Sequence, residues 1–357
     1  MMQKIPLGLT FDDVLLIPQK SDILPSEVDL ITRLTRRIKV RVPLLSAAMD
    51  TVSETAMAIA LARQGGIGVL HRNCTIEQEV NMVKEVKGRE KNLMVGAAVG
   101  PHDIERAKAL DLASADVIVI DCAHAHKSQV ISDAKKIKRA IKAQLIVGNI
   151  ATAKAARAFL PIADALKVGI GPGSICTTRV VAGVGVPQLR AIMDVAKIAK
   201  KAGVPVIADG GIRYSGDIVK ALAAGADTVM IGSLFAGTDE TPGALITLEG
   251  KKYKAYRGMG SLGAMNAGQS ADRYGQKGSR KYVPEGVEAL VAFKGPLNEV
   301  IFQLLGGVKA GMGYVGAKTI GQLQRKAKFM QITDAGRKES HPHSVLISRK
   351  APNYEQI

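Results

Sequence analysis

Short apolar runs rich in Val, Ile, Leu and Ala recur along the chain, and longer stretches with apolar residues at helical spacing separate them. The runs are almost unbroken rather than alternating, which is typical of parallel strands buried on both faces. Eight strands are predicted on this basis, at residues 43–47, 67–70, 93–98, 117–121, 145–148, 165–168, 205–209 and 228–231.

Amphipathic stretches with helix start signals lie between these runs. Thr75 and Gln78 have the spacing of a capping box, and Gly225 has the position of a C-cap. The predicted helices cover residues 56–63, 80–86, 104–110, 130–141, 153–160, 188–200 and 217–223. The alternation of strand and helix favours a single-domain (β/α)8 TIM barrel over residues 1–357, although the pattern alone leaves a doubly wound sheet open.

Residues 250–285 interrupt this rhythm because they are rich in Gly, Ser and charge. A long loop of this kind inside a compact domain is predicted to be a mobile flap or a disordered segment. Residues 258–263 match GxGxxG, but no strong apolar strand precedes them and no clear helix follows, so we do not interpret them as a dinucleotide fingerprint. The basic residues 337–357 are predicted to form a surface arm.

The chain has 357 residues and a formal charge of +17, which points to an anionic partner. Phosphorylated small molecules and nucleic acid are both candidates, and solvated lysines on helix faces are the simplest explanation. Nucleic acid is the weaker candidate because no aromatic stacking run or reading module is recognisable. Three widely spaced cysteines, no secretory signal and no apolar run of membrane-spanning length predict a cytoplasmic protein without a membrane role.

Polar and glycine-rich segments follow the predicted strands at their carboxyl ends, where TIM barrels carry their active sites. The loops after the seventh and eighth strands commonly bind phosphate in this fold. Here they contain Gly211, Gly232 and Ser233, which favours a phosphate site over glycines that only make tight turns. Asp209 is alternatively a ligand for sugar hydroxyls.

Cys176 lies in an irregular loop, residues 169–179, after the sixth strand. Polar neighbours and Arg179 favour a thiolate there, so Cys176 is predicted to be a nucleophile. We interpret Cys74 and Cys122 as small buried apolar residues. His124 and His126 are weak candidates for metal ligands, because an i, i+2 spacing alone is not diagnostic.

Five segments together resemble the inosine monophosphate (IMP) dehydrogenase and guanosine monophosphate (GMP) reductase family. They are GLTFDDVLLIP at 8–18, SAAMDTV at 46–52, the cysteine loop at 169–179, ADGGIR at 208–213 and YRGMG at 256–260. The resemblance covers almost the whole chain. Arg273-Tyr274 in the flap, with VPEG at 283–286, favours the dehydrogenase branch, and the reductase is the alternative.

The resemblance implies NAD-dependent oxidation of IMP to xanthosine monophosphate (XMP), the committed step of guanine nucleotide synthesis. Cys176 would form a thioimidate at C2 of the purine, and Arg273 would act as the base for water. Tyr274 would position that water, and Thr178 with Glu285 would offer a second proton route.

The resemblance also implies ligands for each part of the two substrates. The phosphate would be held by Ser174, Gly211, Gly232, Ser233 and Tyr256, and the ribose by Asp209. The remaining substrate contacts would be Met49, Gly258, Met259, Gly260 and Glu285. The cofactor NAD would lie along Asp121, His124, Asn149, Gly169 and Gly171.

A potassium ion (K+) and a homotetramer are implied as well. The ion would be bound by backbone carbonyls of Gly171, Gly173 and Cys176, and by Glu339, Ser340 and His341 of a neighbouring subunit. One departure from the family is large: the pair of regulatory CBS modules is absent near residues 87–92. We expect catalysis to survive this absence and nucleotide regulation through those modules to be lost.

Overall fold

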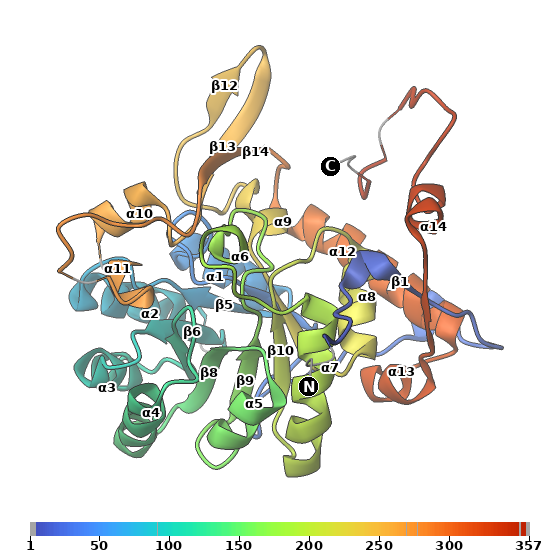
Figure 1. Cartoon of the computed structure of the whole chain (residues 1–357). Coiled ribbons are helices and arrows are strands. Elements are labelled where there is room, and N and C mark those ends of the chain that lie inside the picture. The colour runs from blue at the N-terminus through green and yellow to red at the C-terminus, as the bar shows by residue number, and fades with distance from the viewer. Residues whose placement is uncertain (1–4, 91, 269, 277, 350, 355–357) are drawn as a thin grey trace.

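Eight parallel strands close into a barrel (Figure 1). The computed structural model describes residues 5–90, 92–268, 270–276, 278–349 and 351–354, so the two ends of the expected domain and arm lie outside the described residues. The barrel strands are β4 (Leu44–Ser46), β5 (Ile67–Leu70), β6 (Val95–Val99), β7 (Val117–Asp121), β8 (Gln144–Ile150), β9 (Ala165–Val168), β10 (Val206–Asp209) and β11 (Thr228–Ile231). Pairing of β11 with β4 completes the ring. The eight predicted strands are thereby confirmed, and the open doubly wound sheet is excluded.

Burial on both faces explains why the strands read as unbroken apolar runs. Along β7, Val117 and Val119 belong to the cluster inside the barrel. Ile118 and Ile120 belong to the larger cluster between the strands and the surrounding helices. Successive side chains of a strand point to opposite faces, so each residue must suit one of two apolar environments.

The predicted helices surround the barrel. They are α1 (Thr55–Arg63), α2 (Ile76–Arg89), α3 (Ile104–Leu112), α4 (Ser128–Ala140), α5 (Ala153–Phe159), α7 (Gln188–Ala199) and α8 (Ser215–Ala223). The capping box is confirmed, since Thr75 Oγ1 accepts from the Gln78 backbone and Gln78 Oε1 accepts from the Thr75 backbone. Two further helices, α12 (Leu297–Val315) and α13 (Ile320–Lys326), were not predicted, and α12 packs against α8 and α1.

The prediction of one long loop at residues 250–285 is wrong in its first part. Strand β13 (Lys251–Arg257) pairs antiparallel with β12 (Ile246–Leu248) and β14 (Glu288–Ala292), and this sheet projects above the barrel (Figure 1). The segment between β13 and β14, which we call the flap, carries α10 (Leu262–Ala267) and α11 (Ser270–Arg273). Strand β13 therefore precedes residues 258–263, and helix α10 begins within them. The strand is antiparallel, however, so the segment is not part of a βαβ unit.

A strand from the first part of the chain pairs with one from its last part, outside the barrel. Strand β1 (Val14–Leu16) pairs with β15 (Phe329–Gln331), and β2 (Thr32–Arg33) pairs with β3 (Lys39–Val40). Helix α14 (Asp334–Glu339) follows β15 and leads into an extended, mostly exposed arm. Within the described residues, no helix is both long enough and apolar enough to cross a membrane.

Candidate active site

A cavity opens at the carboxyl ends of the barrel strands. Its floor is made by side chains that point into the barrel, and these are every second residue of a strand. Val119 points into the barrel, so Asp121, two residues further along β7, points inward as well. By the same alternation, Lys167 on β9 points inward like Ala165, and Asp209 on β10 points inward like Ile207. All three polar residues line a cavity of about 140 Å³. The floor of the site is therefore the last inward layer of the barrel, made polar where the layers below are apolar.

Lys167 joins the polar groups of this floor. Its ammonium lies 2.9 Å from Asp121 Oδ1 and 2.7 Å from Asp209 Oδ2, and it also contacts Asn149 Oδ1. The Asn149 amide donates to Asp209 Oδ2 at 2.9 Å and to the carbonyl of Gly169 at 2.6 Å. The Lys167 side chain is only 2% exposed, so these contacts are made away from bulk water. We did not single out Lys167 in the sequence, although a lysine inside an apolar strand was the available signal.

Cys176 lies at the rim of the same cavity, on the loop between β9 and α6 (Thr178–Val181). Its Sγ is 3.2 Å from Thr178 Oγ1. The loop is held from the far side by the end of the flap. The backbone of Thr177 donates to the Glu285 carbonyl at 2.9 Å, and the backbone of Val287 donates to the Ile175 carbonyl at 3.0 Å. Thr178 and Glu285 line the cavity as well.

Arg179 braces the loop. Its guanidinium donates to the carbonyls of Ile170 at 3.1 Å and Val186 at 2.5 Å. Burial lowers the pKa of Arg179, and the negative charge of a Cys176 thiolate opposes that shift. Arg179 thus contributes positive charge near the thiol, as expected, and also fixes the loop that carries it.

Two flap residues line the cavity, and one of them reaches its floor. The Arg273 guanidinium forms an ion pair with the Asp121 carboxylate, and the Arg273 carbonyl accepts from the Ala123 backbone at 3.2 Å. Burial lowers the pKa of Arg273. Its Nε is buried and has no hydrogen-bond partner among the described residues. Tyr274 lines the cavity beside it. The flap therefore places a partly unsatisfied guanidinium in the same space as the Cys176 loop.

A second cavity, of about 300 Å³, adjoins the first, and both are lined by Gly173, Gly210 and Gly232. The second cavity contains the five residues expected to hold a phosphate: Ser174, Gly211, Gly232, Ser233 and Tyr256. Burial raises the pKa of Tyr256, and a hydrogen bond with Ser174 opposes that shift.

Arg213 also lines this second cavity, and the sequence reasoning missed it. Burial alone would lower the pKa of Arg213, but its hydrogen bond to Asp12 raises it. The cavity therefore combines glycine backbone, hydroxyl groups and a permanent positive charge, the donors that an anion requires. An arginine two residues after the Asp-Gly-Gly turn was the signal that could have found it.

The other predicted residues divide by position. Met49, Gly169, Gly171, Gly173, Gly258 and Met259 line the first cavity. Gly260 lies just behind it, and its carbonyl accepts from the Glu285 backbone at 3.0 Å. His124 is exposed in the loop after β7 and is not among the lining residues. Glu339, Ser340 and His341 lie at the end of α14, which Figure 1 shows well apart from the loop before α6.

The described residues contain no group of three or more His, Cys, Asp or Glu side chains placed to hold a metal ion. A cation at this site would therefore depend on backbone carbonyls. The loop from Gly171 to Cys176 supplies several of them, one of which, that of Gly173, accepts from the Cys176 backbone at 3.1 Å.

Comparison with known proteins supports the family resemblance over nearly the whole chain. Residues 8–343 match the family described as IMP dehydrogenase / GMP reductase domain. Three similar relatives are each named inosine-5′-monophosphate dehydrogenase. They come from Aquifex aeolicus (42% identical), Methanocaldococcus jannaschii (44%) and Cryptosporidium parvum (46%). The alignments cover 99%, 97% and 99% of this chain and 98%, 97% and 99% of the three relatives.

These relatives differ from the chain in length. The alignment with the Aquifex protein spans 482 positions against 357 residues here, so at least 125 positions have no counterpart in this chain. The alignment with the Cryptosporidium protein spans only 398 positions. In this chain α2 ends at Arg89 and β6 begins at Val95, which leaves no room for a further domain between them.

Proposed function

The chain belongs to the IMP dehydrogenase / GMP reductase family, and on that premise we propose that it oxidises IMP to XMP with NAD as hydride acceptor. The observation that carries the proposal is the convergence of Cys176 with Arg273 and Tyr274 of the flap on one cavity. A nucleophile and a water-directing pair are the two parts that the oxidation requires in one place. The product would enter guanine nucleotide synthesis.

In the first half of the reaction Cys176 bonds to the purine. Its thiolate adds to C2 of IMP, and the hydride on C2 leaves for NAD, which gives a thioimidate and NADH. The phosphate would lie in the second cavity and the ribose would bind Asp209, which together bring C2 to the sulfur. We assign Asp121, Asn149, Gly169 and Gly171 to NAD, with His124 as an outer contact.

In the second half water replaces the sulfur. Arg273 takes a proton from water, the resulting hydroxide adds to C2, and the thiolate of Cys176 leaves as XMP forms. The unpartnered Nε of Arg273 and the burial that lowers its pKa both suit this role. Tyr274 would orient the water, and Thr178 with Glu285 would offer a second route for the proton. In the structure Arg273 is paired with the carboxylate of Asp121, which we assign to NAD. NADH must therefore leave before the flap takes this position.

Replacing Arg273 with alanine is expected to separate the two halves. Hydride transfer needs Cys176 and NAD, so a burst of NADH close to one equivalent should remain. Steady-state turnover should fall by about 10²- to 10³-fold, the usual contribution of a general base. Rapid-mixing absorbance at the NADH band measures both. Loss of the burst in proportion to turnover would contradict the assignment.

The pH dependence of hydrolysis should reflect the same residue. A base acts in its neutral form, and burial moves the pKa of Arg273 downward, toward the working range. The neutral fraction grows with pH, so the hydrolysis rate should rise from neutral to alkaline pH, and this slope should be absent from Arg273→Ala. Single-turnover decay of the Cys176 adduct at several pH values tests this. An equal slope in both proteins would contradict it.

Gly232→Ala should weaken binding of the substrate phosphate. A Cβ at this position would lie 2.8 Å from the Tyr256 hydroxyl and 3.4 Å from Met49 Sδ, so the phosphate cavity must distort. KM for IMP is expected to rise about tenfold, with a smaller effect on kcat, because a ground-state contact is lost. Steady-state kinetics with varied IMP measures this, and an unchanged KM would argue against a phosphate at Gly232.

We further propose that K+ is bound by the carbonyls of Gly171, Gly173 and Cys176, with Glu339, Ser340 and His341 of a neighbouring subunit. A hard cation suits oxygen donors of this kind, and bound there it would stabilise the Cys176 loop. The separation of α14 from this loop within one subunit is what an intersubunit site requires (Figure 1). The resulting assembly would be a homotetramer. We also propose that the additional positions of the longer relatives correspond to a regulatory module pair that would follow α2, so residues 1–357 form one catalytic domain.

Incubation with IMP and NAD tests the function directly, with NADH absorbance as the readout. We expect NADH to form only when both are present. Turnover with GMP and NADPH, and none with IMP and NAD, would instead identify a reductase.

A further inference from the structure

The flap is docked on the loop between β5 and α2, through Arg72 and Asn73, which do not line the cavity that contains Cys176. Asn73 makes two contacts with flap backbone: its Oδ1 accepts from Ser270 at 3.1 Å and its Nδ2 donates to the Ala264 carbonyl at 3.2 Å. Arg72 adds an ion pair with Asp272, with 3.1 Å between Nη1 and Oδ2. Asn73 and Arg72 are both buried beneath the flap. These contacts hold α10 and α11 against the loop between β5 and α2.

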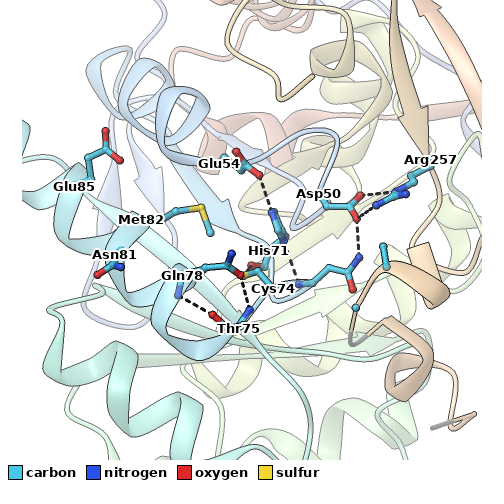
Figure 2. Close-up of a pocket in the computed structure, with 13 residues that line it drawn as sticks. Asp50, Glu54, His71, Cys74, Thr75, Gln78, Asn81, Met82, Glu85 and Arg257 are labelled. Atoms are coloured by element: carbon cyan, nitrogen blue, oxygen red, sulfur yellow. Dashed lines mark hydrogen bonds and ion pairs between the residues drawn. The ribbon is translucent and has the colours of Figure 1, made fainter. Parts of the chain in front are cut away.

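The same asparagine is tied to the segments that line the catalytic cavity. Asn73 Nδ2 also donates to Asp50 Oδ2 at 2.7 Å. The Asp50 carboxylate in turn accepts from Arg257 at 3.1 Å and 2.6 Å (Figure 2). Asp50 follows Met49 and Arg257 follows Tyr256, two residues that line the cavity. One hydrogen-bond network therefore joins the docked flap to both substrate-binding segments.

The other side of this network is open. A groove of about 750 Å³ separates α2 from β13, and Asp50, Asn73, Arg257 and Gly268 line it (Figure 2). The fit beneath the flap is close, since a Cβ on Gly268 would lie 2.6 Å from Asn73 Oδ1. When the flap leaves, the adjoining groove opens Asn73 to water, which replaces its hydrogen bonds to the flap at little cost. Such contacts suit a flap that must dock and leave once in every catalytic cycle.

We propose that Asn73, assisted by Arg72, is a positioning residue that seats the flap for the hydrolytic half of the reaction. Asn73 does not line the cavity that contains Cys176, so hydride transfer does not depend on it. Arg273 belongs to α11, the helix whose first residue Asn73 binds. The side-chain amide of Asn73 thus acts on catalysis through the position of Arg273. The catalytic consequence rests on the proposed function, but the docking itself does not.

The variants Asn73→Ala and Asp272→Ala test this from the two sides of the contact. Asn81→Ala is the matched control, because Asn81 lines the same groove on α2 without a hydrogen bond to the flap among the described residues. For Asn73→Ala we expect an NADH burst within about twofold of wild type. We also expect steady-state turnover at least tenfold lower and a Cys176 adduct as the major steady-state species. Asp272→Ala should change in the same direction, and Asn81→Ala should match wild type.

Hydrogen exchange provides a readout that needs no activity. Backbone amides of residues 262–267 and 270–274 should exchange faster in Asn73→Ala than in Asn81→Ala. Equal exchange in the two variants, or a burst that falls together with turnover, would overturn the proposal. If wild type forms no NADH from IMP and NAD, the proposed function fails, while the exchange comparison still decides whether Asn73 seats the flap.

Discussion

Cys176→Ala should lower NADH formation by at least about 10⁴-fold, the loss expected when a covalent nucleophile is removed. The sulfur makes the only bond between protein and substrate in the proposed cycle, and no neighbouring group of the loop can replace it. Affinity for IMP should change little, because most of the proposed phosphate and ribose ligands, namely Gly211, Gly232, Ser233, Tyr256 and Asp209, lie outside the Cys176 loop. Steady-state kinetics and calorimetric titration of IMP measure the two effects.

Cys74→Ala is the matched control. Cys74 lies outside the catalytic cavity, and burial raises the pKa of its thiol to about 11, which leaves it protonated and unreactive. Its activity should stay close to that of wild type. Turnover retained in Cys176→Ala, or lost in Cys74→Ala with the fold intact, would remove Cys176 from the centre of the mechanism.

Lys167→Met should be the most damaging change outside the nucleophile loop. Methionine keeps most of the length of the side chain but leaves Asp121 and Asp209 facing each other without the ammonium between them. Removing one partner from a buried charge cluster typically costs about 3–5 kcal/mol. We expect kcat/KM for NAD to fall by about 10²- to 10³-fold, with KM for IMP raised as well, because we assign one carboxylate to each substrate.

Two controls separate this role from stability. Lys167→Arg keeps the charge and should recover part of the activity. Lys138→Met removes a comparable lysine, paired with Asp164 away from the site, and should leave turnover unchanged. The urea midpoint of each variant shows how much of the cost falls on folding. Near-normal kinetics in Lys167→Met would mean that the floor carboxylates need no bridging cation.

Much of the barrel was predictable because strands buried on both faces have unbroken apolar sequences. Runs such as residues 117–121 contain no polar residue until the strand ends, and the strand end is also where the site begins. Period-two parity, applied to residues 165–168, would have predicted that Lys167 points inward with Ala165. The inward direction of Lys167 was not predicted, because a single lysine in a four-residue strand is usually exposed to solvent.

The elements that were not predicted owe their conformation to tertiary contacts. Helix α12 contains glycines that weaken a helical signal, yet a Cβ on Gly311 would lie 2.8 Å from the Val219 side chain on α8. Close packing of the two helices therefore selects a residue that local propensity disfavours. Strand β13 is rich in lysine and reads as a loop, although Lys254 and Tyr256 are buried where it meets the barrel.

The contacts of the flap could not be predicted from the sequence, because they too depend on tertiary structure. Asn73 and Ser270 are far apart in the sequence, and neither belongs to a motif with a known mechanism. Arg273-Tyr274 was recognisable only through the resemblance to a family. The ion pair of Arg273 with Asp121 depends on how the flap folds back over the barrel.

Mass spectrometry of the protein quenched during turnover with IMP and NAD tests the central claim most directly. We expect a purine nucleotide attached to the peptide that contains Cys176, and more of it when Arg273 is replaced by alanine. An adduct on Cys74 or Cys122, or rapid turnover with no adduct on Cys176 in either protein, would contradict it.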